Sequence, residues 1–189
     1  MQELTPVRDV MRARRMISCV GEINEYSANN VCQQLLAMDF ENPEQDIILK
    51  VSSFGGCLLS GFGICDTIGL IRPRVITLVV DKCMSAGSLI HLHGTHGLRV
   101  ASPNAVVMVH QLSGGGQGSA SEMKDAADEA DRLQHILEDA YKKRSTMTKK
   151  KLKEIFSKDS MLPAPVALEL GIIDRIVKNH KELYALTNH

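Results

Sequence analysis

The sequence has no tryptophan, only 4% aromatic residues, and no excess of charge of either sign. Its 22 basic residues equal its 22 acidic residues, so the formal net charge is zero. Nucleic acids and anionic membrane surfaces both attract proteins with a clear basic excess. The charge balance therefore argues against both kinds of partner. It also produces little self-repulsion, which permits assembly into oligomers.

Long apolar runs and disulfide patterns are also missing. No apolar stretch approaches the ~18 residues of a membrane span, and no hydrophobic signal core follows the arginines near the N-terminus. The five cysteines are an odd number and include no CxxC pair. This pattern favours reduced, mostly buried thiols over a disulfide framework. We therefore expect a cytoplasmic protein, with an organellar stroma or matrix as the open alternative.

The 189 residues, 44% of them hydrophobic, suit one domain over residues 1–189. Short apolar segments alternate with amphipathic ones, which predicts an α/β domain with parallel strand pairing. Ser27 is the expected N-cap of the first helix in this pattern. The expected strands cover residues 16–20, 46–51, 75–80, 98–101, 105–109 and 172–177. The expected helices cover residues 27–38, 85–92, 119–144, 148–157 and 165–170, and a further one ends near residue 70.

The predicted helix 119–144 is the longest in the chain and has an alanine-rich apolar stripe. Met123, Ala127, Leu133 and Leu137 are among the stripe residues, which recur at three- and four-residue steps. Such a stripe fits either contact with something beyond the domain or packing across the domain's own sheet. The sequence leaves both alternatives open.

Ser85 and His110 are the first candidates for chemistry. Ser85 lies where a hydrophobic strand gives way to an apolar helix, so its hydroxyl is expected near free backbone N–H groups that favour negative charge. The alternative is an ordinary N-cap serine, and the spacing is not that of a GxSxG elbow. His110 ends a predicted strand, where a neutral imidazole can act as a general base.

A glycine pair and several acids complete the candidates. Gly55-Gly56 follows a predicted strand and would let the backbone approach a ligand, although a simple tight turn explains the pair equally well. The residues alone do not select one acid. Asp159, Asp174, Asp81 and Asp66 all remain possible.

These residues lie within motifs that resemble the proteolytic subunits (ClpP) of the Clp protease family over residues 12–178. The residue numbers of Ser85 and His110 differ by 25, and those of His110 and Asp159 by 49. The order and spacing of the motifs make the joint match strong, although each motif alone is weak. The matching motifs are SSFGG at 52–56, CMSAG at 83–87, VMVHQ at 107–111, GGGQG at 114–118, KDSM at 158–161 and ALELGIID at 167–174.

The resemblance implies the choice of acid and the roles. By position, Ser85 matches the nucleophile, His110 the base and Asp159 the orienting carboxylate. The backbone N–H groups of Gly56 and Ala86 match the oxyanion donors. The family needs no cofactor or metal.

The resemblance also implies a crotonase-like (ClpP-like) spiral of strand–helix units with a protruding helix–strand handle at about residues 112–145. Handles of this kind hold together two stacked seven-membered rings. Gly114, Gly115 and Gly116 would form an edge strand that pairs with an extended polypeptide substrate. No GxxxxGK[ST] loop is present, so ATP use is expected to belong to an AAA+ unfoldase partner.

Several residues depart from the family pattern. Phe54 and Leu112 replace prolines that would stiffen loops beside the site. Lys50 stands where the family has an aromatic residue in the pocket for the unfoldase, which argues against conventional docking. A divergent paralogue that shares a mixed barrel with a second ClpP subunit fits these differences. His91 and His93 lie about 200° apart on a helix, so we expect surface or subunit-contact histidines, with His96, and not metal ligands.

The leading hypothesis is a serine endopeptidase subunit that hydrolyses unfolded polypeptides to short peptides. The alternative is a catalytically weak or inactive subunit that shapes or regulates a mixed barrel. A crotonase-type acyl-CoA enzyme is the weakest candidate, because that class needs no serine–histidine–acid set.

Overall fold

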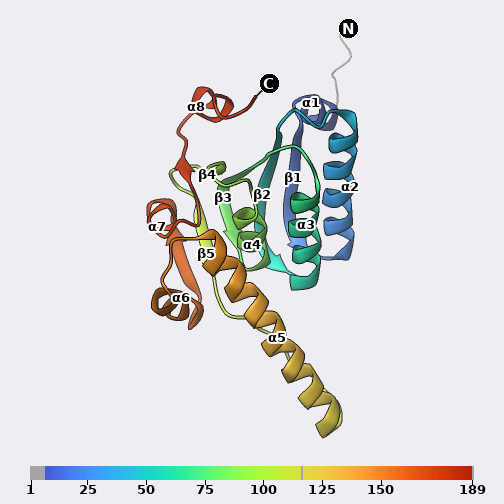
Figure 1. Ribbon diagram of the computed structural model, residues 1–189, viewed down its shortest axis with the longest axis vertical. Coiled ribbons are helices and arrows are strands. Elements are labelled where there is room, and N and C mark those ends of the chain that lie inside the picture. Colours follow the sequence, from blue (N-terminus) through green and yellow to red (C-terminus); the bar gives the residue numbers. More distant parts are fainter. Residues whose placement is uncertain (1–6, 116, 189) are drawn as a thin grey trace.

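A parallel-dominated sheet forms the centre of the computed structural model, which describes residues 7–115 and 117–188 (Figure 1). Helices α2, α3 and α4 flank the sheet, and α5 projects away from it. In chain order the elements are α1 (Val7–Ala13), β1 (Met16–Ile23), α2 (Glu25–Glu41), β2 (Ile47–Gly56), α3 (Leu58–Leu70), β3 (Val75–Met84), α4 (Ala86–Leu92), β4 (Arg99–Ala101), β5 (Val106–Val109), α5 (Ala120–Arg144), α6 (Lys149–Phe156), β6 (Ser160–Pro163), α7 (Ala164–Glu169), β7 (Arg175–Ile176) and α8 (His180–Tyr184).

The strands pair in the order β1-β2-β3-β4-β7, all in parallel. Strand β3 diverges along its length, because its first half pairs with β4 and its end pairs with β5. The predicted α/β class with parallel pairing is confirmed. Strand β6 pairs with β5 in antiparallel fashion and was not predicted from the sequence. Its four residues, Ser-Met-Leu-Pro, include no β-branched residue and end in a proline, so they give no strand signal.

The main core lies between one face of the sheet and the helices α2, α3 and α4. Ile47, Leu49 and Val51 of β2 contribute to it, and they alternate with Ile48, which faces the opposite side. On that opposite side Ile48 joins a smaller buried cluster with Leu78 and other strand residues. Leu183, Tyr184 and Leu186 from the C-terminal segment pack against this cluster.

Helix α2 begins earlier than predicted. Its N-cap is Asn24, whose side chain accepts a hydrogen bond from the Ser27 N–H, while the Ser27 hydroxyl accepts one from the Asn24 N–H. Ser27 is therefore the third residue of a capping box, and its prediction as N-cap was wrong. Both residue types cap well, so composition alone did not distinguish them.

Helix α5 does not lie across its own sheet, and that alternative is wrong. It extends away from the body of the domain (Figure 1), and its buried residues are Leu137 and Tyr141 near its C-terminal end. Met123, on the predicted stripe, is 49% exposed. The outer part of the stripe thus faces solvent in the single chain.

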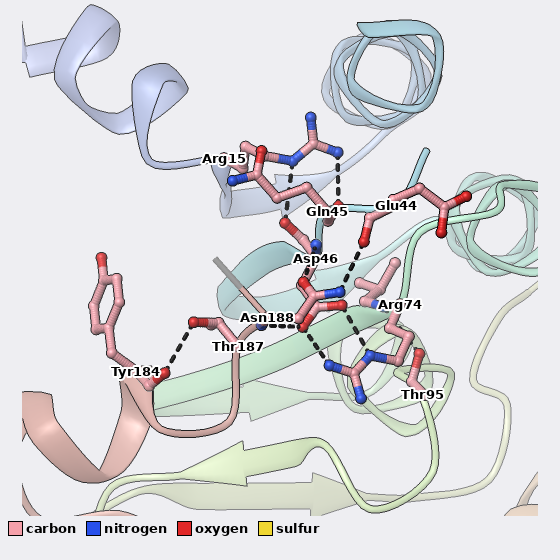
Figure 2. Close-up of polar contacts among 10 residues, drawn as sticks. Arg15, Glu44, Gln45, Asp46, Arg74, Thr95, Tyr184, Thr187 and Asn188 are labelled. Atoms are coloured by element: carbon pink, nitrogen blue, oxygen red, sulfur yellow. Dashed lines mark hydrogen bonds and ion pairs between the residues drawn. The ribbon is translucent and has the colours of Figure 1, made fainter. Parts of the chain in front are cut away.

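The C-terminal segment is fastened to the start of β2 through Asp46 (Figure 2). The side chain of Asp46 is buried and accepts hydrogen bonds from the Arg74 guanidinium and from the Asn188 N–H. The Asn188 side chain accepts a hydrogen bond from the Asp46 N–H and donates one to the Glu44 carbonyl. Close by, the buried Arg15 guanidinium donates to four backbone carbonyls, including those of Gln45 and Asp46.

Candidate active site

Ser85 lies between β3 and α4 in a backbone conformation that non-glycine residues rarely adopt. Its φ is 51° and its ψ is −124°. Ser85 occupies the N-cap position of α4, but its side chain makes no capping hydrogen bond. The ordinary N-cap interpretation is therefore wrong. A strained backbone at a hydroxyl that is not used for capping is typical of a functional position.

The hydroxyl of Ser85 instead contacts His110. Its Oγ lies 2.8 Å from Nε2 of His110. His110 is the first residue after β5, and its side chain is 19% exposed. Nδ1 of the same ring lies 3.2 Å from a carboxylate oxygen of Asp159. Because a carboxylate accepts, Nδ1 is assigned as the donor, which leaves Nε2 free to accept the Ser85 proton.

The other acidic candidates have other partners or positions. Asp174 receives hydrogen bonds from the Arg99 guanidinium and from backbone N–H groups. Burial would raise the pKa of Asp174, but the hydrogen bonds from Arg99 outweigh it and the pKa is lowered. Asp81 accepts from the Ser52 hydroxyl and from Lys82, and Asp66 lies exposed on α3. The structure therefore brings only Asp159, of these four, to His110.

The glycine pair is required by the close approach of other backbone segments. Gly55 has a φ of +108°, and a Cβ atom there would lie 2.7 Å from the Cβ of Ser85. Gly56 has a φ of +144°, and a Cβ atom there would lie 2.2 Å from the Ile23 carbonyl oxygen. The Ser53 hydroxyl accepts from the Gly55 N–H and donates to the Gly21 carbonyl. The pair is thus more than a simple tight turn.

A cavity of about 60 Å³ opens beside Ser85 and His110. Gly56 and Ala86, the two residues whose backbone matches the oxyanion donors, line the same cavity. Its remaining wall is mixed, with apolar side chains from β5 and α5 and a buried pair of hydroxyls. The other lining residues are Leu58, Ser88, Val109, Gln111, Leu112, Ser113, Leu137 and Tyr141.

The glycine-rich segment leads from this cavity to the projecting helix. Gly114 and Gly115 border an open groove of about 530 Å³ along α5, whereas Gly116 lies outside the described residues. Residues 110–115 and 117 form no strand in the single chain. Pairing of this segment with a substrate stays a prediction.

The histidines of α4 differ from expectation. His91 is fully buried and neither ring nitrogen has a hydrogen-bond partner in the described part of the chain, so the prediction of a surface or subunit-contact residue was wrong for it. Nδ1 of His93 bonds the Leu89 carbonyl at 2.8 Å. Among residues 7–115 and 117–188 no group of three His, Cys, Asp or Glu side chains is placed to hold a metal ion.

The structure describes the state of the cysteines, for which the sequence predicts reduced and mostly buried thiols. All five cysteines are free, with Cys19, Cys65 and Cys83 buried and Cys57 exposed. Burial raises the pKa of Cys83, two residues before Ser85, so this thiol is a packing group. No helix within the described ranges has the length and apolarity to cross a membrane.

Sequence reasoning missed two residues of the cavity, Ser88 and Tyr141. Their hydroxyl oxygens lie 2.6 Å apart, and both side chains are fully buried. Ser88 lies one helical turn after Ser85, which is a usable signal. Tyr141 continues the three- and four-residue spacing of the α5 stripe, but nothing local indicates its contact with Ser88, which spans 53 residues.

The site combines a parallel-dominated sheet, a serine hydrogen-bonded to a histidine, and a carboxylate 3.2 Å from the other nitrogen of that ring, all beside a cavity. This arrangement is typical of the serine hydrolase class of site. The sequence model of one family, Clp protease, matches residues 2–180. The chain therefore belongs to the Clp protease family, as its motifs predicted, and is a ClpP-type protease. The family in general self-assembles and works with an unfoldase.

Proposed function

We propose that this chain is a serine endopeptidase subunit that hydrolyses unfolded polypeptides to short peptides inside a self-compartmentalised Clp-type protease. The proposal rests chiefly on the contacts of His110, whose Nε2 lies 2.8 Å from Ser85 Oγ and whose Nδ1 lies 3.2 Å from Asp159. A serine hydroxyl becomes a nucleophile when an adjacent base takes its proton, and both distances suit that transfer.

In the proposed reaction, Ser85 Oγ attacks the carbonyl carbon of the peptide bond while its proton passes to His110 Nε2. Asp159 holds the imidazole in the correct tautomer and stabilises its positive charge. The carbonyl oxygen becomes an oxyanion beside the N–H groups of Gly56 and Ala86. As the C–N bond breaks, His110 gives its proton to the leaving amine, and water then hydrolyses the acyl-enzyme through the same base.

Assembly is the second part of the proposal. The exposed stripe that begins at Met123 on α5 supports contact with another subunit, in two stacked seven-membered rings held by handles. We also propose that the domain is a crotonase-like spiral and that residues 112–145 form its handle. The free thiols support a reducing compartment such as the cytoplasm.

Docking of an AAA+ unfoldase is proposed with a different geometry from the conventional one. Lys50 shares one face of β2 with Ile48, and a charge on that apolar face disfavours a purely hydrophobic partner. A second ClpP paralogue in the same barrel would supply the conventional dock.

A fluorophosphonate probe tests the nucleophile directly, because it reacts with activated serine hydroxyls. Wild type should be labelled, whereas Ser85→Ala should not. Ser60→Ala, which removes a serine from α3, is the matched control and should be labelled like wild type. Labelling that persists in Ser85→Ala would refute the assignment.

A structural or regulatory subunit of a mixed barrel is the second candidate. The exposure of Asp159, 76% of whose side chain is accessible, favours it, because water competes for a carboxylate in that position. Purified homomeric protein that cleaves a short fluorogenic peptide would exclude this role as its only one. Cleavage only after co-expression with a second paralogue would support it.

A further inference from the structure

The hydroxyl pair of Ser88 and Tyr141 joins the projecting helix to the backbone of Ser85. The oxygens of the pair lie 2.6 Å apart. The Ser88 Oγ also lies 2.7 Å from the Ser85 carbonyl oxygen. Three residues from two helices and the nucleophile turn are thus connected by two short hydrogen bonds.

The direction of these bonds follows from the groups that make them. A carbonyl oxygen only accepts, so Ser88 donates its one hydroxyl proton to Ser85. Tyr141 must then donate its phenolic proton to Ser88. Burial raises the pKa of the Tyr141 phenol, so the phenol keeps the proton that it donates.

The carbonyl that accepts the second of these hydrogen bonds belongs to Ser85, whose backbone is strained. Ser85 has a φ of 51°, and its carbonyl also accepts from the N–H groups of Ser88 and Leu89 at 3.0 and 3.2 Å. A conformation of this kind persists only where surrounding contacts fix it. The Ser88 hydroxyl adds a third and shorter contact, on the same residue whose Oγ faces His110.

Tyr141, the donor of the first hydrogen bond, lies near the C-terminal end of α5, where this helix packs against the rest of the domain. Tyr141 is fully buried and packs edge-on against the Phe156 ring at 5.3 Å between centroids. Only Leu137 is buried beside it on this helix, and both residues line the cavity at Ser85. The seating of the projecting helix therefore depends on residues that contact the site.

We propose that Tyr141 and Ser88 are positioning residues, which hold Ser85 in the orientation that faces His110. The inference rests on the proposed peptidase function. It adds two residues, outside the serine, histidine and carboxylate set, whose contacts fix the backbone of the nucleophile. The two hydroxyl groups bond each other and the Ser85 carbonyl, so they act through the backbone of the nucleophile.

Tyr141→Phe is the sharpest test, because it keeps the ring and its contact with Phe156 and removes one hydroxyl. We expect kcat on a short fluorogenic peptide to fall about tenfold while KM changes by less than about twofold. Ser88→Ala should have the same effect. The kcat of the double variant should be no lower than that of the slower single variant, because both substitutions interrupt the same chain of two hydrogen bonds.

Tyr26→Phe is the matched control, since Tyr26 is 82% exposed, and it should match wild type. A Tyr141→Phe enzyme with unchanged kcat would overturn the inference. A rise in KM with kcat unchanged would also overturn it, because it would mark Tyr141 as part of the cavity wall alone.

Crystal structures of wild type and Tyr141→Phe separate this inference from the proposed function. A Ser85 φ that leaves the positive region in the variant supports positioning, even if wild type neither cleaves peptides nor reacts with the fluorophosphonate. An unchanged φ together with unchanged kcat refutes positioning and leaves the peptidase proposal standing.

Discussion

The carboxylate of Asp159 lies 3.2 Å from Nδ1 of His110 although 76% of the Asp159 side chain is exposed. An ion pair or charged hydrogen bond is weakened by water and salt in such a position. The imidazole itself is mostly shielded, at 19% exposure. In the single chain, Asp159 therefore lies on the solvent-exposed side of the mostly buried His110 ring.

Asp159→Asn tests the role of this carboxylate. The amide keeps the shape of the side chain but favours the wrong imidazole tautomer, so we expect kcat to fall by about 10² to 10⁴. Steady-state hydrolysis of a fluorogenic peptide measures the change. Asp66→Asn, on the exposed side of α3, is the control and should retain full activity. Equal losses in the two variants would contradict the assignment of Asp159.

Gly56→Ala should prevent correct folding of the site. The new Cβ atom would lie 2.2 Å from the Ile23 carbonyl oxygen, and the residue has a φ of +144°. We expect a loss of at least about 2 kcal/mol in the free energy of unfolding, measured by urea denaturation. Gly63→Ala in α3 is the matched control, because a Cβ atom at that position would have no atom within 4 Å other than those of its chain neighbours and its own helix backbone. The control should be neutral or gain up to about 1 kcal/mol from helix propensity.

His91 should make the protein less stable in mild acid. Burial, and secondly the charge of Arg99, lowers the pKa of His91 to about 3, whereas an unfolded histidine titrates near about 6.5. Between these values the unfolded chain binds more protons, so the free energy of unfolding falls as the pH falls, by up to about 1.4 kcal/mol per pH unit. This contribution is fully retained above about pH 6.5.

His91→Leu removes this titration and an imidazole without hydrogen-bond partners among the described residues. We expect the variant to equal or exceed wild type in stability at pH 7 and to exceed it clearly at pH 5. Urea denaturation at the two pH values gives the difference. The exposed His96 provides the control His96→Gln, which should follow the wild-type profile. A His91→Leu protein as acid-sensitive as wild type would count against the buried neutral histidine.

Asp46→Asn should loosen the C-terminal segment and destabilise the chain. The side chain of Asp46 is 1% exposed and bonds both Arg74 and the Asn188 N–H. Nε of Arg74 bonds Oδ1 of Asp46, whereas Nη2 of Arg74 and the Asn188 N–H both bond Oδ2. An amide has one oxygen, so it cannot accept at both of these atoms, and it lacks the negative charge that pairs with Arg74. We therefore expect a loss of about 1 to 3 kcal/mol. Limited proteolysis after residue 177 should accelerate. Glu129→Gln removes an exposed pair with Arg132 on α5 and should leave both measurements unchanged.

Much of the fold was predictable because local patterns agree with it. The β-branched segment 75–80 became the central strand β3, and the segment 119–144 became α5 with Ser119 as its N-cap. The prediction failed where two residue types suit the same place, as at Asn24 and Ser27. It also failed for His91, because polarity predicts exposure while the packing of α4 against β2 and β3 decides it.

The family, the α/β class and the candidates Ser85, His110 and Asp159 could all be predicted from the order of the residues alone, because motifs and hydrophobic periodicity are local features of the chain. That Asp159, and not Asp174 or Asp81, lies beside His110 follows from the folded chain. The tertiary structure also decided that the α5 stripe leaves the sheet and that Tyr141 contacts Ser88. His110 and Asp159 are 49 residues apart, and Ser88 and Tyr141 are 53 residues apart. Contacts at such separations are set by the chain crossovers and by packing, because local sequence preferences do not reach that far.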